Sequence, residues 1–353
     1  MNLLVTGGAG FIGSAFVRHV LAYSPGTRIV TLDKLTYAGN LENLAPVDGH
    51  PDHQFVRGDI CDAVTVASIL EDHRIDAVVH FAAESHVDRS ILSPAHAIDT
   101  NVRGTATLLA AAHAAKIARF LLVSTDEVYG DIDAPREADE TFPLKPSSPY
   151  AASKAGADLL ALAYVRTFKL PVVITRASNN YGPYQFPEKL IPLMIANAME
   201  GLPLPIYGDG LQIRDWLYVE DHCRAIVAAL ERGRDGEVYN IGGNCALTNR
   251  EVVTRVLHIV GAPETLMQTV ADRAGHDRRY ALRSDKIERE TGFRPEVPFE
   301  AGLATTVQWY RDNAEWTRRV RSGEYRNYYR QNYGWRSGAS GAETKAGAAI
   351  GPQ

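Results

Sequence analysis

The stretch F-L-L-V-S-T-D-E-V-Y-G, residues 120–130, predicts a buried strand with a polar turn at its end. Phe120 to Ser124 are apolar or small, which is typical of a strand covered on both faces of a parallel sheet. Thr125, Asp126 and Glu127 follow at once. Because open α/β sheets bind ligands beyond the carboxyl ends of their strands, this triplet stands where chemistry would be done. Taken alone, it also fits a solvated loop or a helix cap.

Strands and helices alternate on both sides of this stretch. The spacing of apolar residues predicts strands at 2–6, 28–32, 54–57, 77–81, 120–124, 171–175 and 238–241. It predicts helices at 14–22, 64–72, 98–115, 150–168, 188–200, 219–232 and 249–260. Prolines at 143, 146 and 149 indicate a loop before Tyr150. Alternation of this kind indicates an α/β fold with a doubly wound parallel sheet.

The composition narrows the class of protein. A chain of 353 residues with 45% hydrophobic content can bury a sizeable core in one large domain or two. A net charge of −5, with both signs mixed along the chain, gives no field suited to nucleic acid. Three dispersed cysteines fit neither a disulfide framework nor a zinc site, and no metal is expected. Without a leader pattern or a long apolar run, we expect a soluble cytoplasmic protein and no membrane partner.

A glycine-rich turn follows the first predicted strand. Gly7, Gly10 and Gly13 are spaced as a variant of the dinucleotide fingerprint, in which backbone approaches a pyrophosphate at a helix N-terminus. Asp33 ends the second strand, twenty residues after Gly13. A carboxylate there can bind both hydroxyls of the adenine ribose and would repel the extra phosphate of NADP. The pattern therefore predicts bound NAD, with a structural βαβ unit that holds no cofactor as the alternative.

Tyr150 and Lys154 lie four residues apart and thus on one face of a predicted helix. A lysine ammonium beside a phenol favours the phenolate, so we expect Lys154 to lower the pKa of Tyr150 and make it a usable base. An exposed pair on a helix surface gives the same spacing. The dinucleotide fingerprint upstream favours the functional interpretation.

Together these motifs resemble the extended short-chain dehydrogenase/reductase superfamily. Within it, Thr125-Asp126-Glu127 is similar to the signature of dTDP-glucose 4,6-dehydratases. The likeness covers about residues 1–330, including D-K-L-T-Y-A-G-N at 33–40, A-A-E-S-H-V-D-R-S at 82–90 and D-R-A-G-H-D-R-R-Y at 272–280. Phe81 stands where we would expect a smaller aliphatic residue, which is a conservative change.

The resemblance implies an NAD-dependent hydro-lyase that makes dTDP-4-keto-6-deoxyglucose from dTDP-glucose for deoxysugar biosynthesis. Tyr150 would take the O4 proton during oxidation at C4, Lys154 would assist it, and Thr125 would bind O4. Glu127 would remove the C5 proton and Asp126 would protonate the departing C6 hydroxyl. Consecutive strand residues face opposite ways, so both carboxylates can face a sugar only if the strand ends before them.

The resemblance also assigns the binding residues. For NAD they are Gly7, Gly10, Phe11, Ile12, Gly13, Asp33, Lys34, Thr36, Asp59, Ile60, Phe81, Ala82, Ala83, Ser85, Thr100, Ser124, Tyr150, Lys154 and Asn180. For the nucleotide sugar they are Ser85, Thr125, Asn179, Lys189, Leu190, Pro205, Ile206, Tyr207, Arg214, Asn249, Asp272, Arg273, His276 and Tyr280. Arginine forks such as Arg214 and Arg273 suit a pyrophosphate. From its charges alone, the 272–280 run is also a plausible solvated loop.

The same resemblance implies two domains and a homodimer. Residues 1–178 with about 212–244 would form an NAD-binding Rossmann domain, and 179–211 with about 245–330 a nucleotide-sugar domain. The subunits would pair through the helices near 100–115 and 150–168. Residues 331–353 would form a C-terminal tail, disordered over 337–353 because that segment lacks core-forming residues.

Three alternatives remain at this point. A nucleotide-sugar 4-epimerase would need Tyr150 and Lys154 but no acid–base pair at 126 and 127. A dehydratase of the GDP-mannose type is disfavoured by Asp33 if it uses NADP. A non-catalytic NAD-sensing regulator would not need the five catalytic positions.

Overall fold

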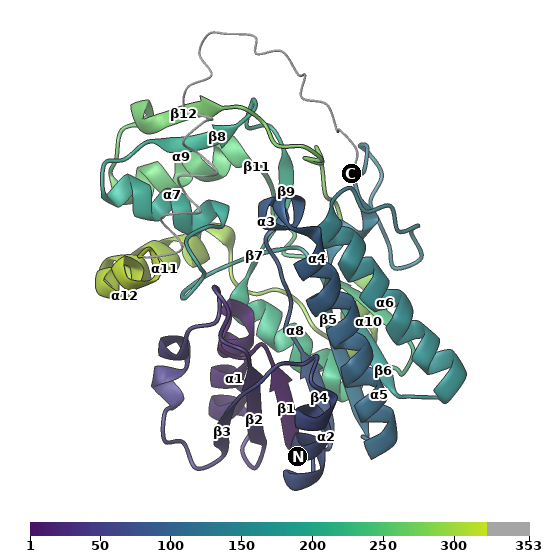
Figure 1. The fold of residues 1–353 in the computed structure, drawn as a ribbon. Helices are drawn as coiled ribbons and strands as arrows, with labels where there is room; N and C mark the ends of the chain where they lie inside the picture. The colour runs from purple at the N-terminus through teal and green to yellow at the C-terminus, as the bar shows by residue number, and fades with distance from the viewer. Residues whose placement is uncertain (323–353) are drawn as a thin grey trace, which may run out of the picture.

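The computed structural model describes residues 1–322, and a seven-stranded parallel sheet is its largest layer (Figure 1). The strand order is β10-β6-β5-β4-β1-β2-β3, so the winding reverses between β1 and β4. This confirms the predicted doubly wound sheet. The strands are β1 (Asn2–Thr6), β2 (Arg28–Asp33), β3 (His53–Arg57), β4 (Ala77–His80), β5 (Arg119–Thr125), β6 (Val172–Ala177) and β10 (Val238–Ile241).

Helices cover both faces of this sheet. Since successive strand residues point to opposite faces, Leu3 and Val5 pack with α1 and α8, whereas Leu4 packs with α2 and α5 on the other side. All three leucine and valine side chains are fully buried. The helices are α1 (Phe11–Tyr23) and α8 (Val219–Arg232) on the first face, and α2 (Ala63–Asp72), α5 (Thr105–Ala115) and α6 (Pro149–Phe168) on the second.

Several helix starts differ from the sequence prediction by one to three residues; α1, for example, begins at Phe11 rather than Ser14. Helix α6 begins at Pro149 rather than Tyr150, because Ser148 caps it by accepting a hydrogen bond from the Ala151 N–H over 3.1 Å. The helix expected over 98–115 is π-helical at Ile98–Gly104 (η2) and becomes α-helical only at Thr105. Before it lie two short helices, α3 (Val87–Leu92) and α4 (Pro94–Ala97).

A second group of elements builds its own core from Tyr181, Trp216, Val252, Phe299 and Leu303. It holds a three-stranded sheet of β7 (Asn179–Tyr181), β9 (Ile213–Tyr218) and β11 (Ala246–Thr248), and the pair β8 (Leu204–Tyr207) and β12 (Met267–Val270). Its helices are α7 (Leu190–Met199), α9 (Asn249–Val260), α11 (Phe299–Asp312) and α12 (Ala314–Val320). Thr248 caps α9 in a capping box with Glu251.

The exact division into two domains stays a prediction. Strand β9 pairs outside the seven-stranded sheet, whereas α10 (Asp285–Thr291) returns from the C-terminal part of the chain to pack on α8 and β10. Residues 323–353, including the tail expected to be disordered, lie outside the described residues. The remaining short elements are η1 (Leu41–Val47), η3 (Asp126–Tyr129) and η4 (Glu264–Leu266).

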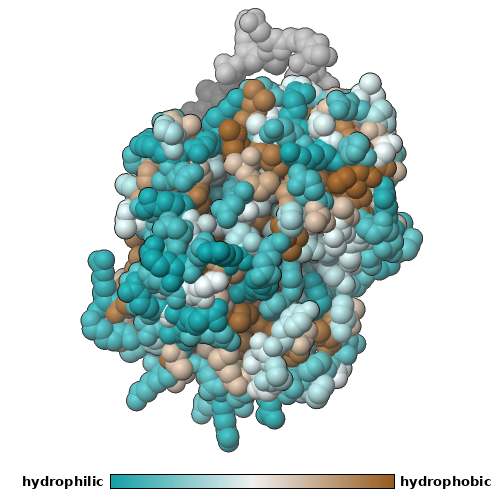
Figure 2. Space-filling model, turned by 180° about the vertical axis from the view of Figure 1, so that it is seen from behind, coloured by the Kyte–Doolittle hydropathy of each residue, from teal (hydrophilic) through white to brown (hydrophobic). Residues whose placement is uncertain are grey.

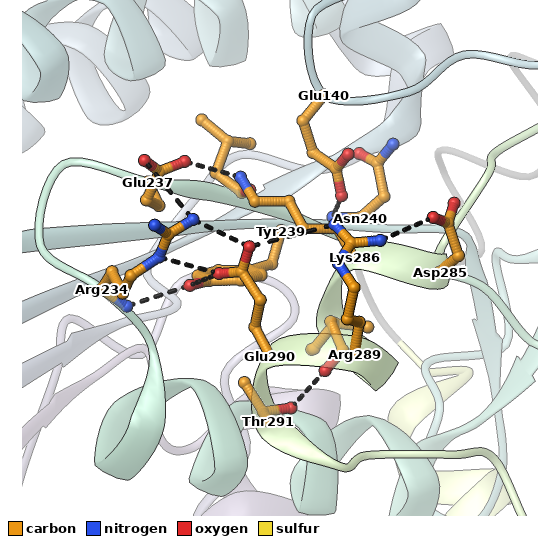
Figure 3. Close-up of polar contacts among 12 residues, drawn as sticks. Glu140, Arg234, Glu237, Tyr239, Asn240, Asp285, Lys286, Arg289, Glu290 and Thr291 are labelled. Carbon is orange, nitrogen blue, oxygen red and sulfur yellow. Dashed lines mark hydrogen bonds and ion pairs between the residues drawn. The ribbon is translucent and has the colours of Figure 1, made fainter.

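A polar network fastens α10 to the edge strand β10 (Figure 3). The Arg234 guanidinium donates to the Glu290 carboxylate over 2.8 and 3.0 Å, and the Tyr239 hydroxyl donates to the same carboxylate over 2.8 Å. Lys286 Nζ lies 2.7 Å from both Glu237 Oε2 and the Val238 carbonyl oxygen. The helix thus covers a strand that would otherwise be an exposed edge.

The face of the molecule drawn in Figure 2 is mainly hydrophilic. On the face drawn in Figure 2, apolar residues occur in small groups between hydrophilic ones. None of the helices in residues 1–322 is long and apolar enough to cross a lipid bilayer.

Candidate active site

A cavity of about 520 Å³ follows the carboxyl ends of β2, β1, β4, β5 and β6. Its lining includes all five predicted catalytic residues and every residue that the resemblance assigned to NAD. Four of the predicted sugar-binding residues also line it: Ser85, Thr125, Asn179 and Lys189. The cavity spans the switch point at which such sheets bind ligands.

The glycine turn is shaped for close approach. Gly7 has φ +72°, and a Cβ there would lie 2.5 Å from the backbone N of Ala82. A Cβ on Gly13 would overlap the carbonyl oxygen of Gly7. Gly10 is the N-cap of α1 and supplies no side-chain cap, so the first N–H groups of the helix stay available to a ligand. Phe11 and Ile12 of this first turn line the cavity, which fits the pyrophosphate of a dinucleotide.

Asp33 ends β2 with its carboxylate almost buried. One oxygen accepts from the Ala9 N–H over 3.0 Å and the other from the Leu35 N–H over 2.8 Å. Burial raises the pKa of Asp33, and these two hydrogen bonds oppose the shift. Each oxygen retains a lone pair for a ribose hydroxyl. Nearby, Lys34 and Asp59 form an ion pair of 2.7 Å at the rim of the cavity.

The strand ends where the catalytic interpretation requires it to end. Strand β5 stops at Thr125, and Asp126–Tyr129 form one turn of 3-10 helix. The turn brings Asp126 and Glu127 to the same cavity, although they are consecutive. Asp126 Oδ2 and Glu127 Oε2 are buried without a hydrogen-bond partner among the described residues. This resolves the difficulty that two successive strand residues would have faced opposite ways.

The two carboxylates differ in their surroundings. Asp126 is 3% exposed, and burial raises its pKa well above the usual range. The charge of Glu127 adds to this shift, and the Arg214 guanidinium opposes it. Burial thus favours the protonated form of Asp126, which suits a general acid.

One expectation about Tyr150 is wrong for this structure. Burial, with the charge of Glu127, raises the pKa of Tyr150, and only a hydrogen bond with Thr125 opposes the shift to any extent. Lys154 is not among the groups that lower it, and the Lys154 Nζ donates instead to the Val123 carbonyl oxygen over 2.7 Å. Burial in turn lowers the pKa of Lys154 to about 8. Both side chains line the cavity, but burial affects the pKa of Tyr150 more than the nearby Lys154 does.

The other predicted sugar-binding residues do not line this cavity. Several form a connected cluster beside it: the Tyr207 hydroxyl donates to Asp88 over 3.0 Å, and His276 Nδ1 lies 2.6 Å from Asp272. The Arg214 guanidinium stacks on the Tyr280 ring at 4.1 Å. The remaining placements are Arg273 at 3.7 Å from Asp88, Asn249 at 3.5 Å from Gln212, Pro205 and the buried Ile206 on β8, and Leu190 at the start of α7.

The cavity lining also includes residues that the sequence interpretation missed. Glu188 is almost fully buried and accepts a hydrogen bond from Arg89 Nε over 3.1 Å. Glu188 stands directly before Lys189, which the resemblance did assign to the site, and this adjacency was a signal that could have found it. His222 on α8 also lines the cavity, and nothing in its amphipathic helix marked it.

Comparisons with known proteins agree with this geometry. The family model described as GDP-mannose 4,6 dehydratase matches residues 4–306. A dTDP-glucose 4,6-dehydratase of Shigella flexneri is 51% identical over 94% of this chain and 99% of its own length. One from Streptomyces niveus is 54% identical over 91% of this chain and 96% of its own.

Solved structures point the same way. A dTDP-glucose 4,6-dehydratase of Streptomyces venezuelae with NAD bound superposes with a TM-score of 0.89 at 56% identity, covering 91% of this chain and all of that one. A UDP-glucose 4-epimerase of Thermotoga maritima reaches a TM-score of 0.83 at 31% identity, covering 89% of this chain and all of that one. The chain therefore belongs to the dTDP-glucose 4,6-dehydratase family.

Proposed function

We propose that this chain converts dTDP-glucose to dTDP-4-keto-6-deoxyglucose, as an NAD-dependent 4,6-dehydratase of deoxysugar biosynthesis. One observation carries the proposal: Asp126 and Glu127 reach the same cavity as Tyr150, Lys154 and Thr125. An epimerase needs the last three residues but has no elimination for an acid–base pair to serve. The 51–54% identity to curated dTDP-glucose 4,6-dehydratases supports the same substrate.

The residues around the glycine turn would hold NAD. The first turn of α1 would bind the pyrophosphate, and Asp33 would accept hydrogen bonds from the adenine ribose. When bound, NAD would accept a hydride from C4 of the sugar and return it to C6. Because the hydride is returned, the chain has no need to exchange its cofactor in each turnover.

The side chains at the other end of the cavity would move the protons. Tyr150 would take the O4 proton as a phenolate, and the hydroxyl of Thr125 would hold O4. Burial and nearby carboxylates oppose ionisation of Tyr150 in this structure, so its activation requires positive charge close to the phenol oxygen. The Lys154 ammonium would supply that charge by leaving the Val123 carbonyl oxygen to which it now donates. Oxidation at C4 makes the C5 hydrogen acidic. Glu127 would then remove that proton while Asp126, whose protonated form burial favours, donates to the departing C6 hydroxyl.

The cluster beside the cavity would hold the nucleotide diphosphate. Arg214 and Arg273 bring two guanidinium groups to it, and each suits a pyrophosphate oxygen pair. The charges of Arg214 and Glu127 act on the Tyr280 phenol, so this cluster lies close to the catalytic carboxylates. Residues Tyr207, Asn249, Asp272 and His276 would complete the site.

We also propose a homodimer, because large apolar side chains are exposed on adjoining elements. Leu92 on α3 is 68% exposed, Ile98 on η2 is 55% exposed and Leu159 on α6 is 59% exposed. Helix α3 and the segment η2 both pack against α6, so the three residues can share one interface. A cytoplasmic location remains a prediction, supported by the unpaired state of Cys61, Cys223 and Cys245.

The test is to incubate the purified protein separately with dTDP-glucose and UDP-glucose and to identify the products by mass and NMR. The proposal predicts a loss of water from dTDP-glucose, with a ketone at C4 and a methyl group at C6. Formation of the galactose epimer without loss of water would instead support the epimerase alternative. Recovery of both sugars unchanged would favour the regulator.

A further inference from the structure

His222 occupies a position that the proposed mechanism does not use. It lies in the first turn of α8, which begins directly after β9. Its side chain is fully buried and lines the cavity. Its ring faces Asn180, which lines the same wall of the cavity from β7. Buried polar atoms are normally hydrogen-bonded, but only one of the two ring nitrogens of His222 has a partner among the described residues.

The hydrogen bonds fix the state of the ring. Asn180 Nδ2 donates to the Ser178 carbonyl oxygen over 2.9 Å, so Asn180 Oδ1 is the atom 2.8 Å from His222 Nδ1. An amide oxygen only accepts, and therefore Nδ1 carries the proton. Nε2 is then an acceptor, and it is buried without a partner among the described residues. Burial lowers the pKa of His222 to about 3, which keeps the ring neutral at physiological pH.

This wall lies at the reacting end of the cavity. Ala177, the last residue of β6, is in register with Thr125, the last residue of β5. Residues 178–180 continue from that point. Asp33 ends β2, four strands away in the sheet order, which is about 19 Å at the usual strand spacing. A dinucleotide with its adenine ribose at Asp33 would thus place its other ring near Asn180 and His222.

We propose that Asn180 and His222 form a donor–acceptor pair that recognises the primary carboxamide of the nicotinamide. The second hydrogen of Asn180 Nδ2 donates to the carboxamide oxygen, and His222 Nε2 accepts from the carboxamide NH₂ group. The pair fixes the orientation of the nicotinamide ring. A carboxamide rotated by half a turn would place its NH₂ group against the Asn180 NH₂ group and its oxygen against the His222 Nε2 acceptor. His222 is then a specificity-determining residue. This inference rests on the proposed NAD-dependent function.

Two substitutions of His222 test the roles of its two ring nitrogens one at a time. In His222→Asn, the side-chain NH₂ can replace Nδ1 as the donor to Asn180, but nothing replaces Nε2. In His222→Gln, the longer amide places its oxygen near the position of Nε2. The probe is 3-acetylpyridine adenine dinucleotide, which keeps the carbonyl oxygen of NAD and lacks the NH₂ donor. Each holoenzyme is incubated with equal excess NAD and analogue until the bound ratio no longer changes with time. It is then desalted and denatured, and the ratio is measured by chromatography.

The wild-type protein should retain NAD over the analogue by about tenfold, because the analogue leaves a buried acceptor unpaired. His222→Asn should bring the ratio close to one, and His222→Gln should largely preserve the preference. An unchanged tenfold ratio in His222→Asn, or a ratio near one in the wild type, would overturn the proposal. If His222→Asn does not fold, His222→Leu replaces it with the same expected ratio. No sugar is present, so either result leaves the proposed dehydratase activity standing.

Discussion

The backbone N–H of Glu127 donates to the Thr125 hydroxyl over 3.3 Å, so Thr125 caps the turn that follows β5. This hydrogen bond helps to end the strand and to bring Glu127 into the cavity beside Asp126. A threonine hydroxyl and two carboxylates therefore converge within three consecutive residues. The first prediction follows from the different tasks of these groups.

Replacing Glu127 with glutamine should leave oxidation at C4 intact and block loss of water. The amide keeps the shape of the side chain and removes its basicity, and loss of a general base typically costs about 10² to 10⁴ in rate. Addition of dTDP-glucose should produce NADH absorbance at 340 nm with little 4-keto-6-deoxy sugar. The exposed Glu137→Gln is a matched control and should behave as wild type.

Asp126→Asn should show the same pattern for another reason. Burial favours the protonated form of Asp126, and asparagine reproduces that neutral form but has no acidic proton to give to the departing hydroxyl. Wild-type rates of product formation in both variants would mean that the paired carboxylates are not the elimination machinery, and the epimerase alternative would gain support.

Replacing Tyr150 with phenylalanine should stop both steps while binding of the nucleotide sugar persists. The variant deletes one oxygen and leaves the ring, which is 8% exposed on α6. Single-turnover absorbance should show no NADH, and titration calorimetry with dTDP-glucose should still show binding. Tyr164→Phe, on the same helix but outside the cavity lining, is the control. Full turnover by Tyr150→Phe would refute the assigned role.

The purified protein should carry NAD, because the hydride is returned within each turnover. Denaturation followed by chromatography should release NAD or NADH in an amount near one per chain. NADP should be absent, since the Asp33 carboxylate at the end of β2 would repel its additional phosphate. Release of NADP as the main species would show that Asp33 does not select the cofactor.

The large sheet could be predicted from sequence because its strands are buried on both faces. Short apolar runs such as Phe120–Ser124, alternating with helices, are typical of buried strands in a parallel sheet. The predicted strand positions agree with the structure to within two residues. The smaller sheets were not predicted. Strands β7 and β11 have three residues each, and β8 contains Pro205, so neither length nor periodicity marks them.

The site was predicted by motif, and its electrostatics were not. Spacing placed Tyr150 and Lys154 on one helix face, but it carried no information on how deeply α6 buries them. Desolvation depends on every element packed around a group, which for Tyr150 includes the turn that carries Glu127. The same limit explains why sequence analysis did not identify His222 as a site residue, because its proposed role depends on Asn180, which lies 42 residues away in the chain.

The lowered pKa of Lys154 makes a further prediction about stability and pH. Its folded-state pKa of about 8 lies below the ordinary value of 10.5, so burial of the charge costs about 3 kcal/mol below pH 8. Between about pH 8 and 10.5 the folded protein loses this proton before the unfolded chain does, and the cost disappears.

Lys154→Met should therefore be more stable than wild type at pH 7, and the difference should shrink as the pH rises through this window. Urea unfolding at pH 7, 8, 9 and 10 measures it, with the exposed Lys169→Met at the end of the same helix as control. A stability difference that does not change with pH would contradict the lowered pKa, because only a group that titrates differently in the two states makes the difference depend on pH.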